Sequence, residues 1–312
     1  MTSTCMAEDT VRLHFALPSA RLAPYVSTFY HMQVALPDGE TLTDQLHPEW
    51  GNVRLSPVAH LSAGIGPAPV EPLPRAVATG PTSYATTFTA GPGRSWGIGL
   101  LPLGWLTFMG GPAADHADRI VDVEHDPACA AFAPLLEMLF DGQTVPDIAL
   151  LNDEAARIDA YLLTRLADGR SVPPNDAATV STVHETLVDG KVASVADLAQ
   201  VAGLKLRTME RLSRRAFGFT PKLLLRRQRF LRSLARFMLD PELKWLNTLD
   251  DQYFDQAQFV RDFHRFIGMA PRDYAATPHP VLMAAAKARA ALAGDAVQAL
   301  HRPSGPAASS PA

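Results

Sequence analysis

The sequence has little cysteine: Cys5 and Cys129 are the two in a chain of 312 residues. Two distant cysteines without a C-x-x-C pair exclude a disulfide-stabilised fold, and they give no signal for a structural zinc site or a redox pair. The first residues lack a cationic stretch followed by an apolar one, so we expect no secretory signal. With 47% hydrophobic residues, the composition is that of a globular protein.

Long apolar stretches are also scarce. The uncharged run Ser95–Ala114 has the length of a bilayer span, but it contains repeated glycine and proline residues. These residues interrupt a helix. We therefore expect buried strand and turn in this run, no membrane segment, and a cytoplasmic protein.

The net charge of −4 is small, but the charge is unevenly distributed along the chain. Residues 1–179 contain 9 Lys/Arg and 20 Asp/Glu, whereas residues 180–275 contain 16 and 11. The segment Gly203–Arg236 has eleven basic residues and one acid, Glu210. Such a segment in an acidic chain indicates contact with a polyanion. A solvated basic helix surface is the alternative interpretation.

Composition along the chain predicts an α+β protein. Residues 10–125 are rich in Pro and Gly between short apolar runs, which is typical of a β-rich domain. Helical patterns follow at Ala130–Phe140 and at Asp153–Leu166, with Asp153 placed to cap the second helix. We predict a β-rich regulatory domain over residues 10–170, a linker over 171–178, a helical domain over 179–278, and a largely disordered Ala/Pro-rich tail over 281–312.

The helical domain contains a unit that occurs twice, at an offset of 50 residues. The matching pairs are Met209 and Phe259, Arg211 and Arg261, Arg215 and Arg265, Gly218 and Gly268, and Pro221 and Pro271. Both copies end a helix with G-x-x-P. Glycine is common directly after the last residue of a helix, and the proline that follows cannot continue the helix. We infer two copies of one helical unit.

The first copy has the pattern of a helix-turn-helix. It begins at Ser194–Asp197 with a capping-box-like S-x-x-D and turns at Gly203. Over the following helix, Leu206–Phe217, the apolar residues lie on one face. The other face carries Arg207, Thr208, Arg211, Arg214 and Arg215. In a helix-turn-helix, this second helix enters the DNA major groove.

The second copy has its recognition helix at Asp255–Phe266, with Gln258 at the capping-box position. Its outward residues include Gln256, Ala257 and Arg261. A helix over Pro221–Leu239 separates the two copies and has a length of about 28 Å at 1.5 Å per residue. That length suits two adjacent major grooves, which are ~34 Å apart.

The region Ser194–Tyr274 resembles the double helix-turn-helix domain of the AraC family of bacterial transcription regulators. The resemblance is carried by S-V-A-D-L-A-Q-V-A-G-L, R-T-M-E-R-L-S-R-R-A-F-G-F-T-P and Y-F-D-Q-A-Q-F-V-R-D-F-H-R-F-I-G-M-A-P-R-D-Y. It implies seven helices and sequence-specific binding of double-stranded DNA. L-A-P-Y-V at Leu22–Val26 and G-I-G-L-L-P-L-G at Gly97–Gly104 resemble the cupin-like regulatory domain found in this family.

The resemblance also implies roles for individual residues. Base-reading positions are Arg207, Thr208, Arg211, Gln256, Ala257 and Arg261. Phosphate contacts are expected from Arg214, Arg215, Arg226, Arg229 and Arg265. The chain departs from the family at Ser213, which replaces a large apolar residue, and at Gln252, which replaces the glycine of the second turn. Whether the second unit reads bases or phosphates therefore stays open.

Two other functions stay open as alternatives: a cupin-type enzyme, and a protein-interaction module with degenerate helix-turn-helix units. The N-terminal histidines are His14, His31, His47, His60, His116 and His125, with no H-x-H pair among them. We therefore predict no metal site and no cofactor, and no nucleophile elbow is present, so we expect no enzyme. RNA polymerase, a small-molecule effector and a second copy of the chain stay open as partners.

Overall fold

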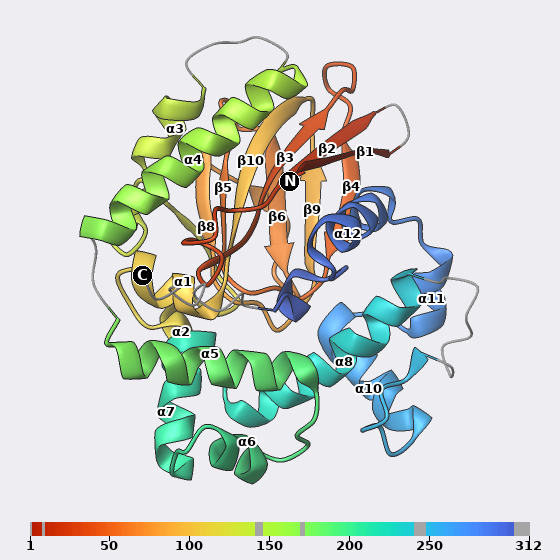
Figure 1. The fold of residues 1–312 in the computed structure, drawn as a ribbon. Helices are drawn as coiled ribbons and strands as arrows, with labels where there is room; N and C mark the ends of the chain where they lie inside the picture. The colour runs from red at the N-terminus through yellow and green to blue at the C-terminus, as the bar shows by residue number, and fades with distance from the viewer. Residues whose placement is uncertain (1, 8–9, 141–145, 169–171, 240–247, 303–312) are drawn as a thin grey trace.

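The computed structural model describes residues 2–7, 10–140, 146–168, 172–239 and 248–302. It contains a β-rich N-terminal domain (residues 2–168), a helical domain (174–276) and a C-terminal segment (280–302) that we call the strap (Figure 1). This order of β-rich and helical parts confirms the predicted α+β class. Within the described ranges, no helix combines the length and hydropathy needed to span a membrane.

Two antiparallel sheets form the described part of the N-terminal domain. The larger has the strand order β1-β2-β3-β10-β5-β8-β11 and the smaller β4-β9-β6-β7. The strands are β1 Thr2–Ala7, β2 Val11–Ala16, β3 Val26–Val34, β4 Leu42–Leu46, β5 Asn52–Leu55, β6 Leu61–Ile65, β7 Glu71–Pro72, β8 Ala76–Thr79, β9 Thr86–Ala90, β10 Gly93–Leu100 and β11 Ile120–Asp122. Short strands between Pro/Gly turns agree with the sequence pattern.

Each face of the larger sheet is covered. Phe15 on β2 packs in one apolar cluster with Phe88 on β9, which joins the two sheets. On the other face, Ile158 and Leu162 of α4 (Ile148–Asp168) pack with Phe29 on β3. Smaller helices complete this domain: α1 Pro102–Phe108, α2 Ala113–His116, η1 Ala130–Phe132 and α3 Pro134–Leu139. The sheets therefore form a scaffold with α1 and α2 at one end (Figure 1).

The helix α4 begins earlier than predicted. It begins at Ile148, and the Asp147 carboxylate accepts a hydrogen bond from Leu150 N at 2.8 Å. Asp147 therefore occupies the capping role expected of Asp153. Asp153 lies within the helix and pairs with Arg157 at 3.1 Å. The periodic apolar residues identified the helix but not its first turn.

The helical domain follows the predicted element order. Its helices are α5 Pro174–Asp189, α6 Val195–Val201, α7 Leu206–Phe217, α8 Pro221–Leu239, α10 Gln256–Ile267 and α11 Pro271–Ala276. The two predicted helices over Leu206–Phe217 and Pro221–Leu239 are confirmed. The range 171–178, predicted as linker, becomes helical from Pro174, because proline is accepted in the first turn of a helix.

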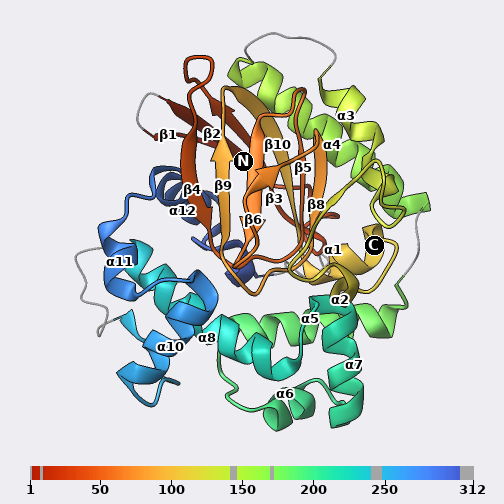
Figure 2. The same ribbon diagram turned by 180° about the vertical axis from the view of Figure 1, so that it is seen from behind.

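The sequence predicts a largely disordered tail over residues 281–312, and this prediction is wrong for residues 281–302. The strap contains α12 (Pro280–Ala293) and the short η2 (Gln298–Leu300). Val281 of α12 packs with Leu13 and Phe88 of the sheets. Figure 2 shows α12 beside β4 of the N-terminal domain, and α12 also contacts α8 of the helical domain. The segment is Ala-rich, so only its tertiary contacts distinguish it from a disordered tail.

Candidate nucleic-acid interface

The first helix-turn-helix unit consists of α6 and α7. The Ser194 hydroxyl accepts a hydrogen bond from Asp197 N at 3.1 Å and caps α6. Gly203 has a φ of +65°, and Leu204 N donates to Ala199 O at 2.8 Å. A side chain disfavours this backbone conformation, so glycine suits the turn. The Ser194 cap and the glycine turn expected from the sequence are both present.

The helix α7 presents a basic face to solvent. Arg207, Arg211 and Arg214 are exposed, and Thr208 is half-buried. The opposite face contributes Met209, Ser213, Ala216 and Phe217 to the core. The structure therefore places the predicted base-reading residues of this unit on the outer side of α7 or at its edge. Their contact with DNA stays a prediction.

The small residue at Ser213 fits a crowded position. Its side chain is fully buried, and the hydroxyl lies 3.6 Å from the sulfur of Met209 one turn earlier. A larger apolar residue, as the family pattern has here, would need the space that Met209 fills. The departure at Ser213 therefore leaves the unit folded, with α7 packed on its neighbours.

The second recognition helix is α10. The Asp255 carboxylate accepts a hydrogen bond from Gln258 N at 2.6 Å, and Gln258 Oε1 accepts one from Phe254 N at 3.2 Å. Asp255 therefore caps α10, and Gln258, at the predicted capping-box position, accepts from the backbone of the residue before the cap. Gln256, Ala257 and Arg261 are exposed, so the second set of predicted base-reading residues also faces solvent.

An exposed aromatic residue precedes α10. Phe254 is 94% exposed, and sequence periodicity did not single it out because it lies outside the helix. Single exposed apolar side chains are normal on protein surfaces, so its exposure alone assigns it no partner. Phe254 lies beside the N-terminal end of α10, next to the exposed Gln256 and Ala257.

Gln252 stands where the resemblance leads one to expect a glycine, and its side chain has a defined structural role. Its amide nitrogen donates to Val192 O at 3.2 Å, and its Oε1 accepts from Arg232 at 3.4 Å. It also donates to Gly190 O. These bonds connect the turn before α10 to the segment between α5 and α6. The departure at Gln252 therefore links the two helix-turn-helix units.

Arg226 and Arg229, two of the predicted phosphate contacts, share one protein partner on α10. Arg226 and Arg229 both pair with Asp262, which is buried on α10, and the Arg229 pair has a distance of 3.2 Å. Arg229 also lies over the Tyr253 ring at 4.4 Å. Burial is the main cause that raises the pKa of Tyr253, and the Asp262 charge raises it further. This cluster holds α10 against α8.

Arg215 and Arg265 occupy equivalent positions of the repeat but have different surroundings. Arg215 pairs with Asp176 at 3.2 Å, and both side chains are about half exposed. Arg265 lies 3.7 Å from the centre of the Tyr84 ring and 3.3 Å from the Ser83 hydroxyl. Arg265, predicted to contact phosphate, therefore contacts the N-terminal domain in this structure.

The C-terminal ends of both recognition helices lie against the N-terminal domain. Phe217, the last residue of α7, packs on the Trp50 ring at 5.6 Å between centres. The Phe266 carbonyl near the end of α10 accepts a hydrogen bond from Ala85 N at 2.6 Å. Figure 1 shows α7 running from α2 towards the edge of the molecule that also carries α6. The N-terminal turns of α7 and α10 therefore point away from the sheets.

Arg227 was missed by the sequence analysis. It lies on α8 next to Arg226, but it is fully buried and donates to Thr82 O at 2.8 Å and to Glu49 O at 3.3 Å. Burial lowers its pKa to about 9. A run of basic residues gives no signal for which one turns inward. Arg227 connects α8 to two loops of the N-terminal domain.

Histidines are buried where the helical domain and the strap meet the N-terminal domain. Burial is the main cause that lowers the pKa of His47, on the N-terminal domain, and of His184, on α5, to about 3 each. His47 Nε2 lies 2.8 Å from the hydroxyl of Tyr274. His184 packs on Trp50 at 5.4 Å. Both rings are therefore neutral in the folded protein near pH 7.

An enclosed cavity lies between the sheets and the strap. It has a volume of about 90 Å³, and its lining includes Phe15, Phe88 and Ala285. Two guanidinium groups, of Arg54 and Arg289, also line it. Arg54 pairs with Glu49 at 3.2 Å, and Arg289 lies over the Phe15 ring at 5.5 Å. The cavity is mainly apolar, with a few convergent polar groups, as small-molecule sites are.

Comparisons with known proteins return structural likenesses at low sequence identity. No protein-family profile matches the sequence, and no curated protein matches it. Among solved structures, ToxT from Vibrio cholerae is 10% identical with a TM-score of 0.41, and the match covers 76% of this chain and 97% of ToxT. The AraC-like transcriptional activator CuxR is 11% identical with a TM-score of 0.30, covering 72% and 81%.

Another solved structure that is similar is wild-type ToxT from Vibrio cholerae bound to an unsaturated fatty acid, with 9% identity and a TM-score of 0.39. That match covers 76% of this chain and 95% of ToxT. These likenesses concern the overall arrangement of the chain.

Proposed function

We propose that this chain is a transcription regulator that binds double-stranded DNA sequence-specifically through α7 and α10. The observation that carries the proposal is the exposed arginine face of α7, on a helix held by a capped helix-turn-helix. In helix-turn-helix proteins, residues near the N-terminal end of the second helix contact base edges. The N-terminal turns of α7 and α10 face away from the N-terminal domain, which supports this use.

The exposed side chains suit major-groove readout. The planar forks of Arg207 and Arg211 match the O6 and N7 acceptors of guanine, and Gln256 matches the N6 and N7 atoms of adenine. Ala257 suits contact with a thymine methyl group. Arg214, further along α7, is exposed and suited to a phosphate oxygen. These assignments make the first unit a reader of bases. Whether the second unit also reads bases can be tested separately, through Gln256 and Ala257.

Arg215, Arg226, Arg229 and Arg265 contribute differently. Each has a protein partner in the structure, so a phosphate contact would exchange one partner for another. The Arg215 pair is exposed, and such pairs contribute about 0–1 kcal/mol, so its exchange costs little. Arg229 is held by a buried carboxylate, and its exchange costs more.

Selection from random duplexes, followed by affinity measurements at several salt concentrations, tests this function. We expect one preferred sequence, and we expect Arg211→Ala to weaken binding by ~1–3 kcal/mol and to relax preference at one base pair. Arg214→Ala should weaken binding on all sequences and reduce the salt slope by about one. Lys287→Ala removes an equal charge from α12 and serves as the matched control.

Absence of any salt-sensitive duplex preference would overturn the proposal. Binding of a protein partner that persists at raised salt, without DNA binding, would favour the interaction-module alternative. Contact with RNA polymerase and self-association stay separate predictions.

We also propose that the cavity beside the strap binds a small, mainly apolar effector. Its volume of about 90 Å³ is below the roughly 150 Å³ of an apolar cavity that holds benzene, so the effector would be smaller than benzene or would enlarge the cavity. Thermal unfolding with a panel of small apolar compounds tests this. We expect at least one compound to raise the Tm of the wild type but not of Ala285→Phe, which fills the cavity. Lys287→Phe, on the exposed side of the same helix, is the control. Equal shifts in both variants would contradict the proposal.

A further inference from the structure

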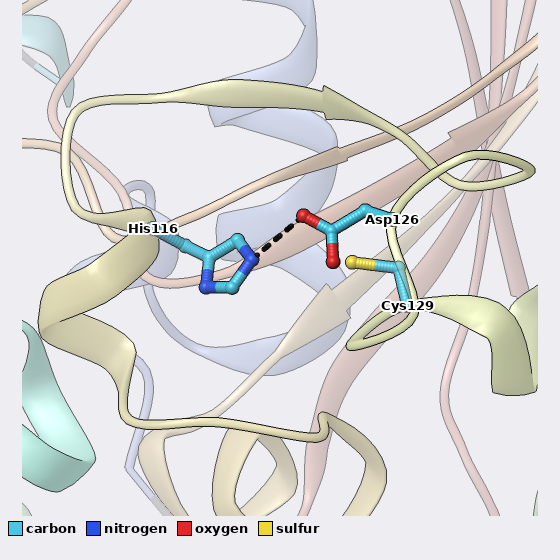
Figure 3. A group of neighbouring side chains, drawn as sticks. All are labelled: His116, Asp126 and Cys129. Atoms are coloured by element: carbon cyan, nitrogen blue, oxygen red, sulfur yellow. Dashed lines mark hydrogen bonds and ion pairs between the residues drawn. The ribbon is translucent and has the colours of Figure 1, made fainter.

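Three potential metal ligands converge beside α2 in the N-terminal domain (Figure 3). His116 is the last residue of α2, and Asp126 and Cys129 belong to the turn between β11 and η1. One donor atom from each side chain lies within 4.8 Å of the other two. His116 Nε2 and Asp126 Oδ2 are 3.0 Å apart. The side chains come from two segments that the fold brings together.

The backbone fixes these three side chains. Asp126 Oδ1 accepts a hydrogen bond from Ala128 N at 2.9 Å, and Cys129 N donates to Asp126 O at 2.9 Å. A Cβ atom at Gly80 would lie 1.9 Å from the carbonyl oxygen of His116, so the two backbones are in close contact. These contacts position the Asp126 carboxylate and the backbones of Cys129 and His116, and an ion bound through Asp126 Oδ2 would leave them unbroken.

The donor set has a definite chemical preference. Thiolate and imidazole ligands suit zinc-type ions, whereas magnesium and calcium prefer oxygen ligands. Asp126 is 26% exposed and gives access from solvent, whereas Cys129 is fully buried. We propose that His116, Asp126 and Cys129 bind one divalent ion of the zinc class, with water as the fourth ligand. Three protein ligands and a water are a common zinc coordination.

The binding step balances in protons. The thiol proton of Cys129 passes to solvent as the sulfur–metal bond forms. His116 gives up its hydrogen bond to Asp126 and binds through Nε2. Its Nδ1 has no hydrogen-bond partner among the described residues and takes the imidazole proton, so the ring stays neutral. Asp126 replaces the same hydrogen bond with a bond to the ion.

The site lies next to α7 and is linked to α10 through Asp118 and Ser83. The helix α2, which ends at His116, lies against α7. Two residues later, Asp118 has a φ of +56° and accepts a hydrogen bond from the Ser83 hydroxyl at 2.7 Å. The same hydroxyl accepts from Arg265 of α10 at 3.3 Å. An ion that restrains His116 therefore restrains a segment in contact with α7 and, through Ser83, with α10. This coupling to DNA rests on the proposed function.

Cobalt(II) titration of the chelator-treated full chain tests the site without DNA. We expect one cobalt ion per chain, an intense thiolate-to-cobalt charge-transfer band, and displacement by zinc. Cys129→Ser should abolish the band, and His116→Gln should weaken binding at least 10-fold. Two controls should leave the spectrum unchanged: Cys5→Ser, the other cysteine, and His125→Gln, an exposed histidine nearby.

A band that survives in Cys129→Ser, or that disappears in Cys5→Ser, would overturn the site, as would binding without any thiolate band. If Cys129→Ser fails to fold by circular dichroism, Asp126→Asn replaces it, and unchanged cobalt affinity in that variant overturns the site. DNA affinity with and without saturating zinc then tests the coupling, with at least a 5-fold change expected. An unchanged affinity refutes the coupling alone, and no DNA binding in either state refutes the proposed function alone.

Discussion

The guanidinium carbon of Arg227 lies 4.0 Å from the centre of the Trp50 ring, so α8 and the N-terminal domain share a buried cation–π contact. The same guanidinium donates to Thr82 O and Glu49 O. Arg227 therefore connects α8, the helix between α7 and α10, to two loops of the N-terminal domain. Arg227 is therefore one of the contacts that hold the helical domain against the N-terminal domain.

Replacing Arg227 should destabilise the folded chain. We expect Arg227→Ala to lower the free energy of unfolding by about 2–4 kcal/mol, because it leaves a cavity and removes the donor of two carbonyl groups. Arg227→Met, which keeps most of the volume, should cost less. Urea unfolding measures both. Lys222→Ala on the same helix is exposed and should change little; equal effects of Lys222→Ala and Arg227→Ala would contradict the prediction.

Acid should weaken the protein below about pH 6.5. The pKa of His47 and of His184 is lowered to about 3 in the folded chain, while an unfolded histidine has a pKa of about 6.5. The unfolded chain therefore binds more protons, and stability is complete above pH 6.5 and is lost as the pH falls towards 3. Between pH 7 and 5, each ring should cost about 2 kcal/mol.

Urea unfolding of His184→Leu at both pH values checks this dependence. His184 is faced by Trp50 and Phe217, and by the charged or titratable groups of His301 and Arg227. The variant should lose about half as much stability between pH 7 and 5 as the two rings together lose in the wild type. A loss as large as that of the wild type would show that His184 is not a source of the pH dependence. The exposed His264→Gln is the control.

The Asp262 cluster should contribute strongly to stability. Asp262 is 1% exposed and pairs with Arg226 and Arg229 while accepting from Tyr253 at 2.9 Å. Asp262→Ala leaves these groups without their acceptor, and we expect a loss of about 3–5 kcal/mol. A double-mutant cycle with Arg229→Ala should give non-additive losses, since both changes remove one contact. The exposed Asp251→Asn is the control, and additive losses would contradict direct pairing.

Asp44 should determine whether the strap stays bound. This residue of β4 accepts hydrogen bonds from Val281 N at 2.9 Å and Leu282 N at 3.0 Å, and its other oxygen lies 2.9 Å from His279 Nδ1. It therefore caps α12 from another domain. Asp44→Ala should cost about 1–3 kcal/mol and make residues 280–302 more sensitive to limited proteolysis. The exposed Asp38→Ala is the control. Unchanged cleavage would contradict this role.

Local signals explain which features could be predicted from the sequence. Ser194, Gly203 and Asp255 act through their own turns, so their roles as caps and turn residues follow from neighbouring residues alone. The β-rich domain followed from Pro/Gly spacing for the same reason. These features do not depend on distant parts of the chain.

Features that depend on distant contacts could not be predicted. Arg215 and Arg265 have equivalent places in the repeat, yet only Arg265 meets Tyr84. Arg227 differs from Arg226 only by the direction it faces on α8. His116 and Cys129 are separated in sequence and give no H-x-H or C-x-x-C pattern. Tertiary packing determines which partner each of these side chains contacts.

The strap has a consequence for how the helical domain moves. The chain passes from α4 to α5 at one side of the helical domain, and after α11 it returns to the N-terminal domain, where Gln298 accepts from Trp50 N at 2.7 Å. The helical domain is thus an insertion, tethered at both ends. Its release and return are unimolecular, so the fraction of released domain is independent of protein concentration. A single peptide-bond cut in either tether would leave the two fragments associated through their shared core.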